Sequence, residues 1–342
     1  MSPFLILGFL LLVFLSAQWI TGRFFRSAAA QRVLDIPNER SSHVVATPRG
    51  GGISIVLTTL PALVVLGTFG LTGPALVSAL VGGGVLVAAI GFADDRSSIP
   101  PRWRLIGHFA AALWVVTWLR GLPALPVLGF PLELGWVGYV LATVYLVWVL
   151  NLTNFMDGID AIAAVEVITV SLGGAILYLV TSPASMHLLT PLVLAAATLG
   201  FLVWNWPPAR IFMGDGGSGF LGLMLAALSL QAAWVEPRLF WSWITLLGVF
   251  IVDATVTLIR RVTRGEKFYE AHRSHAYQHA AARAGAHLPV VICVAAINLG
   301  WLLPLATLVA LSLLDGVTGV LLAYVPLVGM AIWLRAGRPS IK

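Results

Sequence analysis

The chain has 342 residues, of which 59% are hydrophobic and only 10% are charged. Soluble globular domains carry about 25% charged residues, so this composition excludes an ordinary soluble protein and predicts many membrane spans. The net charge of +6 does not predict nucleic-acid binding, because the basic residues lie in short loops and form no long soluble surface. The single cysteine, Cys293, excludes an internal disulfide framework.

Apolar runs long enough to cross about 30 Å of hydrocarbon predict eleven spans. The runs cover residues 4–21, 52–71, 74–93, 105–121, 136–152, 160–180, 189–206, 218–235, 239–259, 289–311 and 317–335. We interpret the first run as a retained span, because it has neither a preceding basic residue nor a clear small-residue cleavage site. The predicted fold class is all-α: a polytopic integral membrane protein with one membrane-embedded domain over residues 1–342.

The loops between the spans differ in charge from one side to the other. All but two of the 20 Lys and Arg residues fall in one set of loops and in the tail after Leu334. This set comprises residues 22–51, 94–104, 151–160, 207–217 and 260–288. The positive-inside rule assigns it to the cytoplasm, which places the N-terminus outside and the C-terminus inside. Most acidic residues lie in the same loops or at their edges, so we expect any chemical site to face the cytoplasm.

The stretch Asn151–Asp160 places two carboxylates, two carboxamides and a glycine between two apolar runs. Asp157 and Asp160 are three residues apart, a spacing that puts both on one face at the start of a helix. Asn151 and Asn154 have the same spacing. Polar groups held at membrane depth usually line a cavity, a metal site or a substrate path. A simpler alternative is that Asp157 caps the following span, which accounts for one of the four groups.

Adjacent carboxylates end the third predicted span at Asp94 and Asp95. Such carboxylates repel one another unless a cation or a proton separates them. Together with other acidic loops on the same side, the pair favours a magnesium or general-base role. The alternative is an ordinary helix end with Arg96 as the counter-ion.

Asp215 lies in a loop rich in glycine, at Gly214, Gly216 and Gly217. A loop of this kind exposes backbone N–H groups that suit a phosphate. An aspartate among them suits a hard cation bound to that phosphate. The alternative is a plain turn in which Asp215 caps the next helix.

Histidines recur in the last cytoplasmic loop at His272, His275 and His279, which would share one helical face. Three interpretations remain: a zinc site, contacts to a diphosphate or sugar, and a solvated amphipathic loop. No cysteine is near, and basic neighbours such as Arg273 favour an anion over zinc.

The first cytoplasmic loop contains Arg40, His43 and Arg49, which precede or adjoin three glycines. These residues also suit an anion. The alternative is that the charges only set the orientation of the chain in the membrane, before a flexible entry to the second span.

Taken together and in this order, these motifs resemble the polyprenyl-phosphate N-acetylhexosamine-1-phosphate transferase family, and within it the members that initiate O-antigen synthesis. The matching pieces are Pro48–Gly52, Gly91–Asp95, Asn151–Asp160, Ile211–Ser218 and the histidine loop, spread over about residues 35–285. The resemblance implies an enzyme in the bacterial inner membrane whose active site faces the cytoplasm. Undecaprenyl phosphate would attack the β-phosphorus of a UDP-N-acetylamino sugar, giving polyprenyl-diphosphate-sugar and UMP. Magnesium is the implied cofactor, with manganese as an alternative, and a homodimer is left open.

Carried over by position, the family pattern implies that Asp215 is the principal metal ligand. Asp94 is implied to deprotonate the lipid phosphate and Asp95 to support the metal, with a nucleophilic or metal-shell role for Asp94 left open. Residues implied to contact the nucleotide and the metal shell are Asn151, Asn154, Asp157 and Asp160, of which the two aspartates are grouped with the catalytic residues. Residues expected to bind the anionic substrates are Arg40, His43, Arg49, His272, Arg273, His275 and His279.

The chain departs from the peptidoglycan translocase of that family at two places. Its histidines are spaced out rather than consecutive, and Ala161 replaces a glycine. Both departures favour a smaller sugar than a pentapeptide-bearing one, such as N-acetylglucosamine or N-acetylfucosamine. Two other classes are a secondary transporter, for which Glu166 and Asp253 are the candidate carboxylates inside spans, and a non-catalytic scaffold for polysaccharide assembly.

Overall fold

The computed structural model describes residues 2–27, 34–35, 46–97, 99–183, 185–266 and 273–339. Its helices are α1 (Pro3–Phe25), α3 (Ile53–Thr68), α4 (Pro74–Ser97), α5 (Pro101–Leu119), α6 (Trp136–Met156), α7 (Ile162–Thr181), α8 (Leu189–Asn205), α9 (Asp215–Val235), α10 (Arg238–Leu246), α11 (Gly248–Val262), α12 (Ala276–Ala284), α13 (Leu288–Ile297), the π-helix η1 (Asn298–Leu302), α14 (Leu303–Ala310) and α15 (Gly316–Trp333). Strands β1 (Leu34–Asp35) and β2 (Thr47–Pro48) pair antiparallel, as do β3 (Leu125–Val127) and β4 (Phe130–Leu132).

Each of the eleven predicted spans coincides with a helix or with consecutive helices, which confirms the all-α membrane fold. By length and composition, seven helical segments of the described chain can cross a membrane, among them Leu288–Ala310, which joins α13, η1 and α14. The pair α10 and α11 would make an eighth span, bent by 71°. Helices α3 and α8 are apolar but have only 16 and 17 residues. The count of eleven and the sidedness therefore stay predictions.

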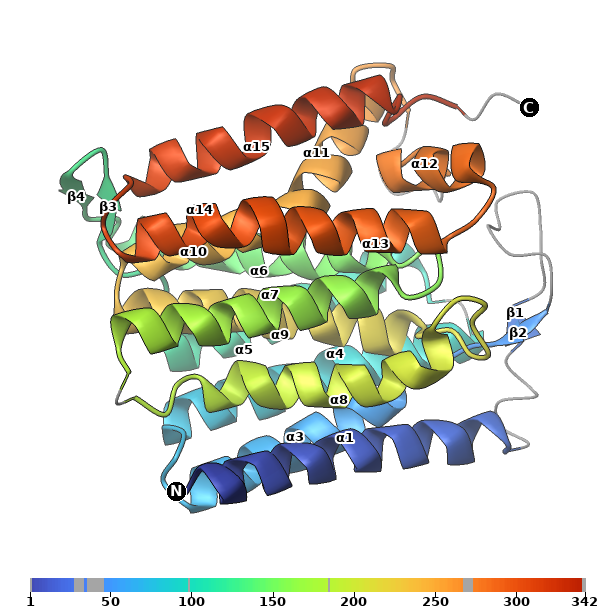
Figure 1. Ribbon diagram of the computed structural model, residues 1–342, viewed down its shortest axis with the longest axis horizontal. Helices are drawn as coiled ribbons and strands as arrows, with labels where there is room; N and C mark the ends of the chain where they lie inside the picture. Colours follow the sequence, from blue (N-terminus) through green and yellow to red (C-terminus); the bar gives the residue numbers. More distant parts are fainter. Residues whose placement is uncertain are drawn as a thin grey trace.

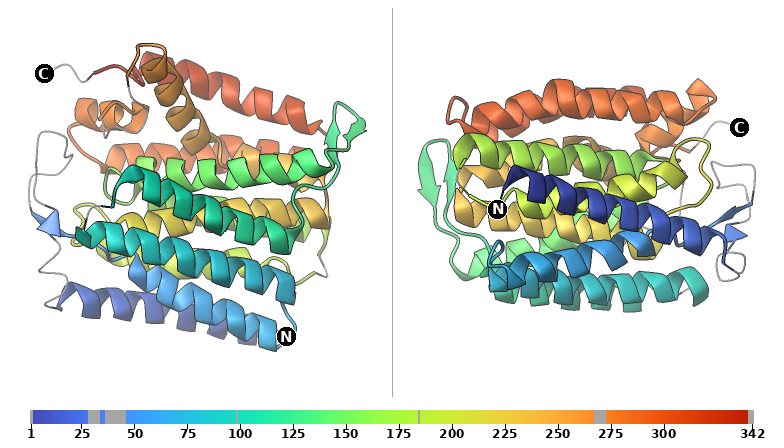
Figure 2. Two further views of the ribbon diagram at one scale, coloured as in Figure 1. Left: turned by 180° about the vertical axis from the view of Figure 1, so that it is seen from behind. Right: turned by 60° about the horizontal axis from the view of Figure 1, so that its bottom comes forward.

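Most of the helices run side by side along one direction, and α11 departs from it (Figures 1 and 2). The β3–β4 hairpin and the N-terminus lie at one end of the bundle. The β1–β2 pair, α12 and the C-terminus lie at the other. The two termini are thus at opposite ends, the arrangement that an odd number of crossings produces.

Helix α9 forms the centre of the bundle, and every residue from Gly216 to Ala233 is buried. A helix that is apolar all round is stable only when other helices cover it on all sides. Glycines let the neighbours come close: a Cβ at Gly222 would lie 2.8 Å from the Cα of Leu150 in α6. At the start of α9, Gly91 of α4 packs against the backbone of Asp215. This packing brings the polar ends of α4, α6 and α9 together.

Candidate active site

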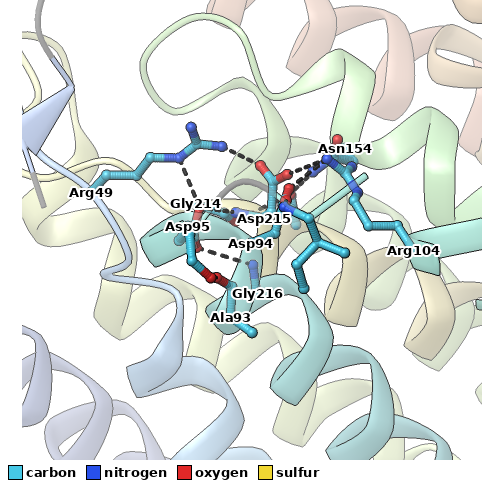
Figure 3. A network of polar contacts seen from close by, with 12 residues as sticks. Arg49, Ala93, Asp94, Asp95, Arg104, Asn154, Gly214, Asp215 and Gly216 are labelled. Carbon is cyan, nitrogen blue, oxygen red and sulfur yellow. Dashed lines mark hydrogen bonds and ion pairs between the residues drawn. The ribbon is translucent and has the colours of Figure 1, made fainter. Parts of the chain in front are cut away.

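Polar side chains from four segments meet where α9 begins, at the end of the bundle that carries β1–β2 (Figure 3). Helix α4 brings Asp94 and Asp95, and α5 brings Arg104. The segment after β2 brings Arg49, and Asp215 is the first residue of α9. We call these five residues the acid–arginine cluster.

Asp95 is fixed at the N-terminus of α9. Its carboxylate accepts hydrogen bonds from the backbone N–H groups of Asp215, at 3.0 Å, and Gly216, at 3.3 Å. The first N–H groups of a helix have no partner within the helix and carry positive partial charge, so a carboxylate is favourable there. The sequence predicted that glycine-loop amides would face a phosphate, but these two amides bind a side chain of the protein itself.

Two arginines link the three aspartates of the cluster. The Arg49 Nε lies 3.0 Å from an Asp95 oxygen, and its guanidinium also pairs with Asp215. Arg104 pairs with Asp94 and lies 3.3 Å from the second Asp215 oxygen. Burial alone would lower the pKa of Arg49, but the attraction of Asp215 and Asp95 outweighs it and raises that pKa.

Arg96 does not serve as the counter-ion that the simpler interpretation assigned to it. Its guanidinium lies 4.1 Å from the centre of the Phe92 ring. The Asp94 carboxylate instead accepts the Ile99 N–H at 2.6 Å and pairs with Arg104. Each of the adjacent carboxylates is therefore paired with its own cation, Asp94 with Arg104 and Asp95 with Arg49, as the repulsion argument required.

The stretch Asn151–Asp160 joins two helices rather than starting one. Asn154 lies in α6 and donates to the Ser218 hydroxyl of α9 at 2.9 Å, while Asn151 donates within its own helix to the Val147 carbonyl. Asp157 follows the last residue of α6. Helix α7 begins only at Ile162, so the prediction that both aspartates share a face of a starting helix is wrong.

The capping alternative for Asp157 is wrong as well, because the residue at the N-cap of α7 is Ala161, with no side-chain hydrogen bond. Ala161 has a φ of 63°, the left-handed region in which glycine is favoured. This explains why a glycine suits that position in the peptidoglycan translocase, one of the proteins whose motifs resemble those of this chain. Asp160 is buried, accepts the Ala209 N–H at 3.1 Å and lies 3.2 Å from His287 Nδ1. Its contacts hold the turn in place.

The charges of the acid–arginine cluster affect the pKa of Asp157. Burial, together with the negative charges of Asp215, Asp95 and Asp160, raises its pKa well above the ordinary value; Arg49 opposes this shift. The raised pKa means that burial and the neighbouring negative charges disfavour the ionised form of Asp157. Perturbed carboxyl groups of this kind gather at functional sites.

The two described histidines of the motif have different partners. His275 precedes α12, is buried, and its Nδ1 lies 3.2 Å from an Asp253 oxygen of α11. His279 lies within α12, where its Nε2 is 3.1 Å from the Arg338 carbonyl. The predicted single histidine face does not form over the part of the motif that the structure describes. Arg273 lies just before His275, and His272 falls outside the described residues, as do Arg40 and His43.

The acid–arginine cluster supplies oxygen donors, the type of ligand that magnesium prefers. Within the described residues no three His, Cys, Asp or Glu side chains converge as a ready-made metal site. The carboxylates of Asp94 and Asp215 bind arginines instead. The donor chemistry therefore fits magnesium, provided that an arginine shifts when the metal binds.

Sequence reasoning missed Arg104 and His108 as site residues. Arg104 counted only as an orientation charge, yet it bridges two aspartates. His108, one turn further along α5, is buried beside this end of the helix. The prolines at 100 and 101 were the available signal, because a chain that turns there brings the start of α5 back to the end of α4.

Comparisons with known proteins agree with this architecture. The pattern of the family described as "Glycosyl transferase family 4" matches residues 77–233. The probable undecaprenyl-phosphate N-acetylglucosaminyl 1-phosphate transferase of Bacillus subtilis is 30% identical over 276 residues, covering 76% of this chain and 73% of the relative. The decaprenyl-phosphate N-acetylglucosaminephosphotransferase of Mycobacterium tuberculosis is 30% identical over 299 residues, covering 75% and 71%.

The phospho-N-acetylmuramoyl-pentapeptide-transferase of Streptococcus pneumoniae matches over a shorter stretch. It is 32% identical over 191 residues, which cover 52% of this chain and 56% of the relative. The family match at residues 77–233 includes three of the five motifs, Gly91–Asp95, Asn151–Asp160 and Ile211–Ser218. The chain belongs to the polyprenyl-phosphate N-acetylhexosamine-1-phosphate transferase family.

Proposed function

We propose that this protein transfers an N-acetylamino-sugar 1-phosphate from a UDP-sugar to undecaprenyl phosphate. The products are polyprenyl-diphosphate-sugar and UMP, and the reaction initiates O-antigen or a related cell-surface polysaccharide. The observation that carries the proposal is the acid–arginine cluster at one end of a membrane bundle. That position suits one soluble reactant and one embedded in the lipid. On the predicted sidedness, the cluster lies at the cytoplasmic face of a bacterial inner membrane. A soluble UDP-sugar in the cytoplasm can reach it there.

The physical problem in this reaction is that both reactants are anionic. Arg49 and Arg104 supply positive charge at the cluster, and preorganised charges in a water-poor site stabilise a transition state more than the same charges in water. Magnesium, held by Asp215 with Asp94 beside it, would supply further charge neutralisation. The turn around Asp157 and the histidine segment would bind the nucleotide and the diphosphate.

We propose a base role for Asp94, whose carboxylate is held in place by two contacts. Both of its oxygens are engaged, one by the Ile99 N–H and the other by Arg104. Each oxygen keeps a second lone pair, and a proton acceptor needs only one. We therefore assign Asp94 to accept the proton of the lipid phosphate when that group enters as a monoanion.

An apolar cavity of about 400 Å³ supports a lipid acceptor. It lies between α11, α12, α13 and α15, and the only charged side chains among its described lining residues are Asp253 and Arg283. The other lining residues include Val252, Val294 and Ala331. The volume and lining suit part of a prenyl chain.

Filling this cavity tests the acceptor assignment. Ala331 is 2% exposed, and Ala331→Phe would occupy the space that the chain requires. We expect the KM for undecaprenyl phosphate to rise roughly tenfold, which is about 1.4 kcal/mol of lost binding, with the KM for the UDP-sugar unchanged. Val325→Phe is the matched control on the same helix, because Val325 is 66% exposed. Equal kinetics for the two variants would remove the cavity from lipid binding.

The proposed reaction itself is tested by UMP release. Purified protein in a lipid environment receives undecaprenyl phosphate, magnesium and each member of a panel of UDP-N-acetylamino sugars. We expect UMP only when both substrates are present, with UDP-N-acetylglucosamine or a 6-deoxy sugar such as UDP-N-acetylfucosamine giving the highest kcat/KM. No UMP with any sugar of the panel would refute the proposal, and loss of UMP when magnesium is removed would assign the metal.

A further inference from the structure

Asp253 is a buried carboxylate that the proposed chemistry does not use. It lies in α11, is 6% exposed, and accepts four contacts. One oxygen lies 3.2 Å from His275 Nδ1 and accepts the Ala276 N–H at 2.9 Å and the Thr257 hydroxyl at 3.1 Å. The other accepts the Tyr277 N–H at 2.9 Å. Asp253 thereby satisfies the first N–H groups of α12 and orients the histidine that precedes that helix.

Tyr277 continues this chain of contacts toward the acid–arginine cluster. Its hydroxyl donates to the Phe155 carbonyl of α6 at 3.1 Å. Gly158 packs against the same hydroxyl, and a Cβ there would also lie 3.1 Å from the Gln278 side chain. Burial and the nearby negative charges of Asp253 and Asp157 raise the Tyr277 pKa well above its ordinary value, so the hydroxyl stays protonated and acts as a donor.

These contacts connect two parts of the site that are far apart in sequence. Phe155 and Gly158 are the residues on either side of Met156 and Asp157, so Tyr277 holds the turn that presents Asp157. Asp253 holds the segment that presents His275. The start of α12 links the two, since the Tyr277 amide binds Asp253 and its side chain binds the turn.

We infer that Asp253 and Tyr277 are positioning residues that fix the histidine segment against the Asp157 turn. The kinetic part of this inference rests on the proposed function. Each half of the site can bind its part of a substrate alone, but in-line transfer requires both halves in one relative position. A displacement of about 1 Å costs on the order of 100-fold in rate, whereas binding is less sensitive.

The sharpest variant is Tyr277→Phe, which removes the hydroxyl and leaves the N–H bond to Asp253 intact. Tyr145→Phe is the matched control, because the Tyr145 hydroxyl also makes a part-buried hydrogen bond, to Ser229 at 2.8 Å, and contacts no residue of the cluster. In lipid nanodiscs, we expect Tyr277→Phe to speed amide hydrogen exchange over residues 156–161 roughly fivefold, and Tyr145→Phe to leave it unchanged. Asp253→Asn should speed exchange over residues 276–281 as well, because its Nδ2 group cannot accept an N–H.

The kinetic readout separates positioning from simple stabilisation. For Tyr277→Phe we expect kcat for UMP release to fall about tenfold, with both KM values within twofold of the unmodified protein. If Tyr277→Phe leaves the exchange over residues 156–161 unchanged, the inference is overturned. It is also overturned if exchange in Tyr277→Phe becomes faster while its kcat equals that of the Tyr145→Phe control. If the unmodified protein releases no UMP, the proposed function fails, and the exchange data alone decide whether Tyr277 holds the turn.

Discussion

Asp215→Asn is expected to lower kcat for UMP release by roughly 10²–10³-fold or more, because it removes the negative charge that both arginines of the cluster bind. Asp215 pairs with both Arg49 and Arg104 and is the proposed metal ligand. The carboxamide keeps the size of the side chain but cannot neutralise two guanidinium groups. The loss should appear in kcat at saturating substrate, and added magnesium should not restore it.

The control for this variant is Asp315→Asn. Asp315 caps α15, where it accepts the Val317 and Thr318 N–H groups. Asparagine caps helices about as well as aspartate, so activity and melting temperature should stay close to those of the unmodified protein. An active Asp215→Asn variant would exclude Asp215 as the metal ligand.

Gly91→Ala is expected to have the second-largest effect, although glycine and alanine differ by one methyl group. The added Cβ would lie 2.6 Å from the carbonyl carbon and oxygen of Asp215 and 2.5 Å from the Gly216 nitrogen. These are backbone atoms of a buried helix, so α4 and α9 must move apart. Overpacking of this kind costs about 1–3 kcal/mol of stability. The accompanying shift of Asp215 from Arg104 should lower kcat on the order of 100-fold.

Gly329→Ala provides the matched comparison, because a Cβ at Gly329 of α15 meets nothing within 4 Å. Its melting temperature should equal or exceed that of the unmodified protein, since alanine favours helix. Thermal unfolding and UMP release measured on both variants separate the two effects. A fully active and stable Gly91→Ala protein would show that the contact between α4 and α9 does not hold the cluster.

Run length was enough to predict the helices, because burial in hydrocarbon requires about 20 apolar residues whatever their order. Run length could not predict the direction of the helix axes. The run at 239–259 contains both α10 and α11, and nothing in its hydrophobicity marks the 71° bend at Leu247. The short lengths of α3 and α8 were also hidden, because their predicted runs included flanking apolar residues that lie outside the helices.

The candidate site shows a similar division. The motifs predicted which loops carry it, but not which groups pair. The nearest basic residue to Asp94 and Asp95 is Arg96, whereas their partners are Arg104 and Arg49. Pairing depends on how α5 and the segment after β2 pack beside the end of α4, which only the folded chain defines. The transporter alternative likewise rested on two isolated acids, yet Glu166 accepts the Asn298 amide at 2.7 Å and Asp253 holds the start of α12.

The pairing of Arg49 and Arg104 with aspartates has a thermodynamic consequence for the two proposed ligands. An entering diphosphate must draw the arginines away from the carboxylates, and an entering cation must draw the carboxylates away from the arginines. Each ligand therefore frees the groups that the other one needs. We expect the cation and the sugar nucleotide to bind with positive cooperativity, and reciprocity requires the same coupling factor whichever of the two is titrated first.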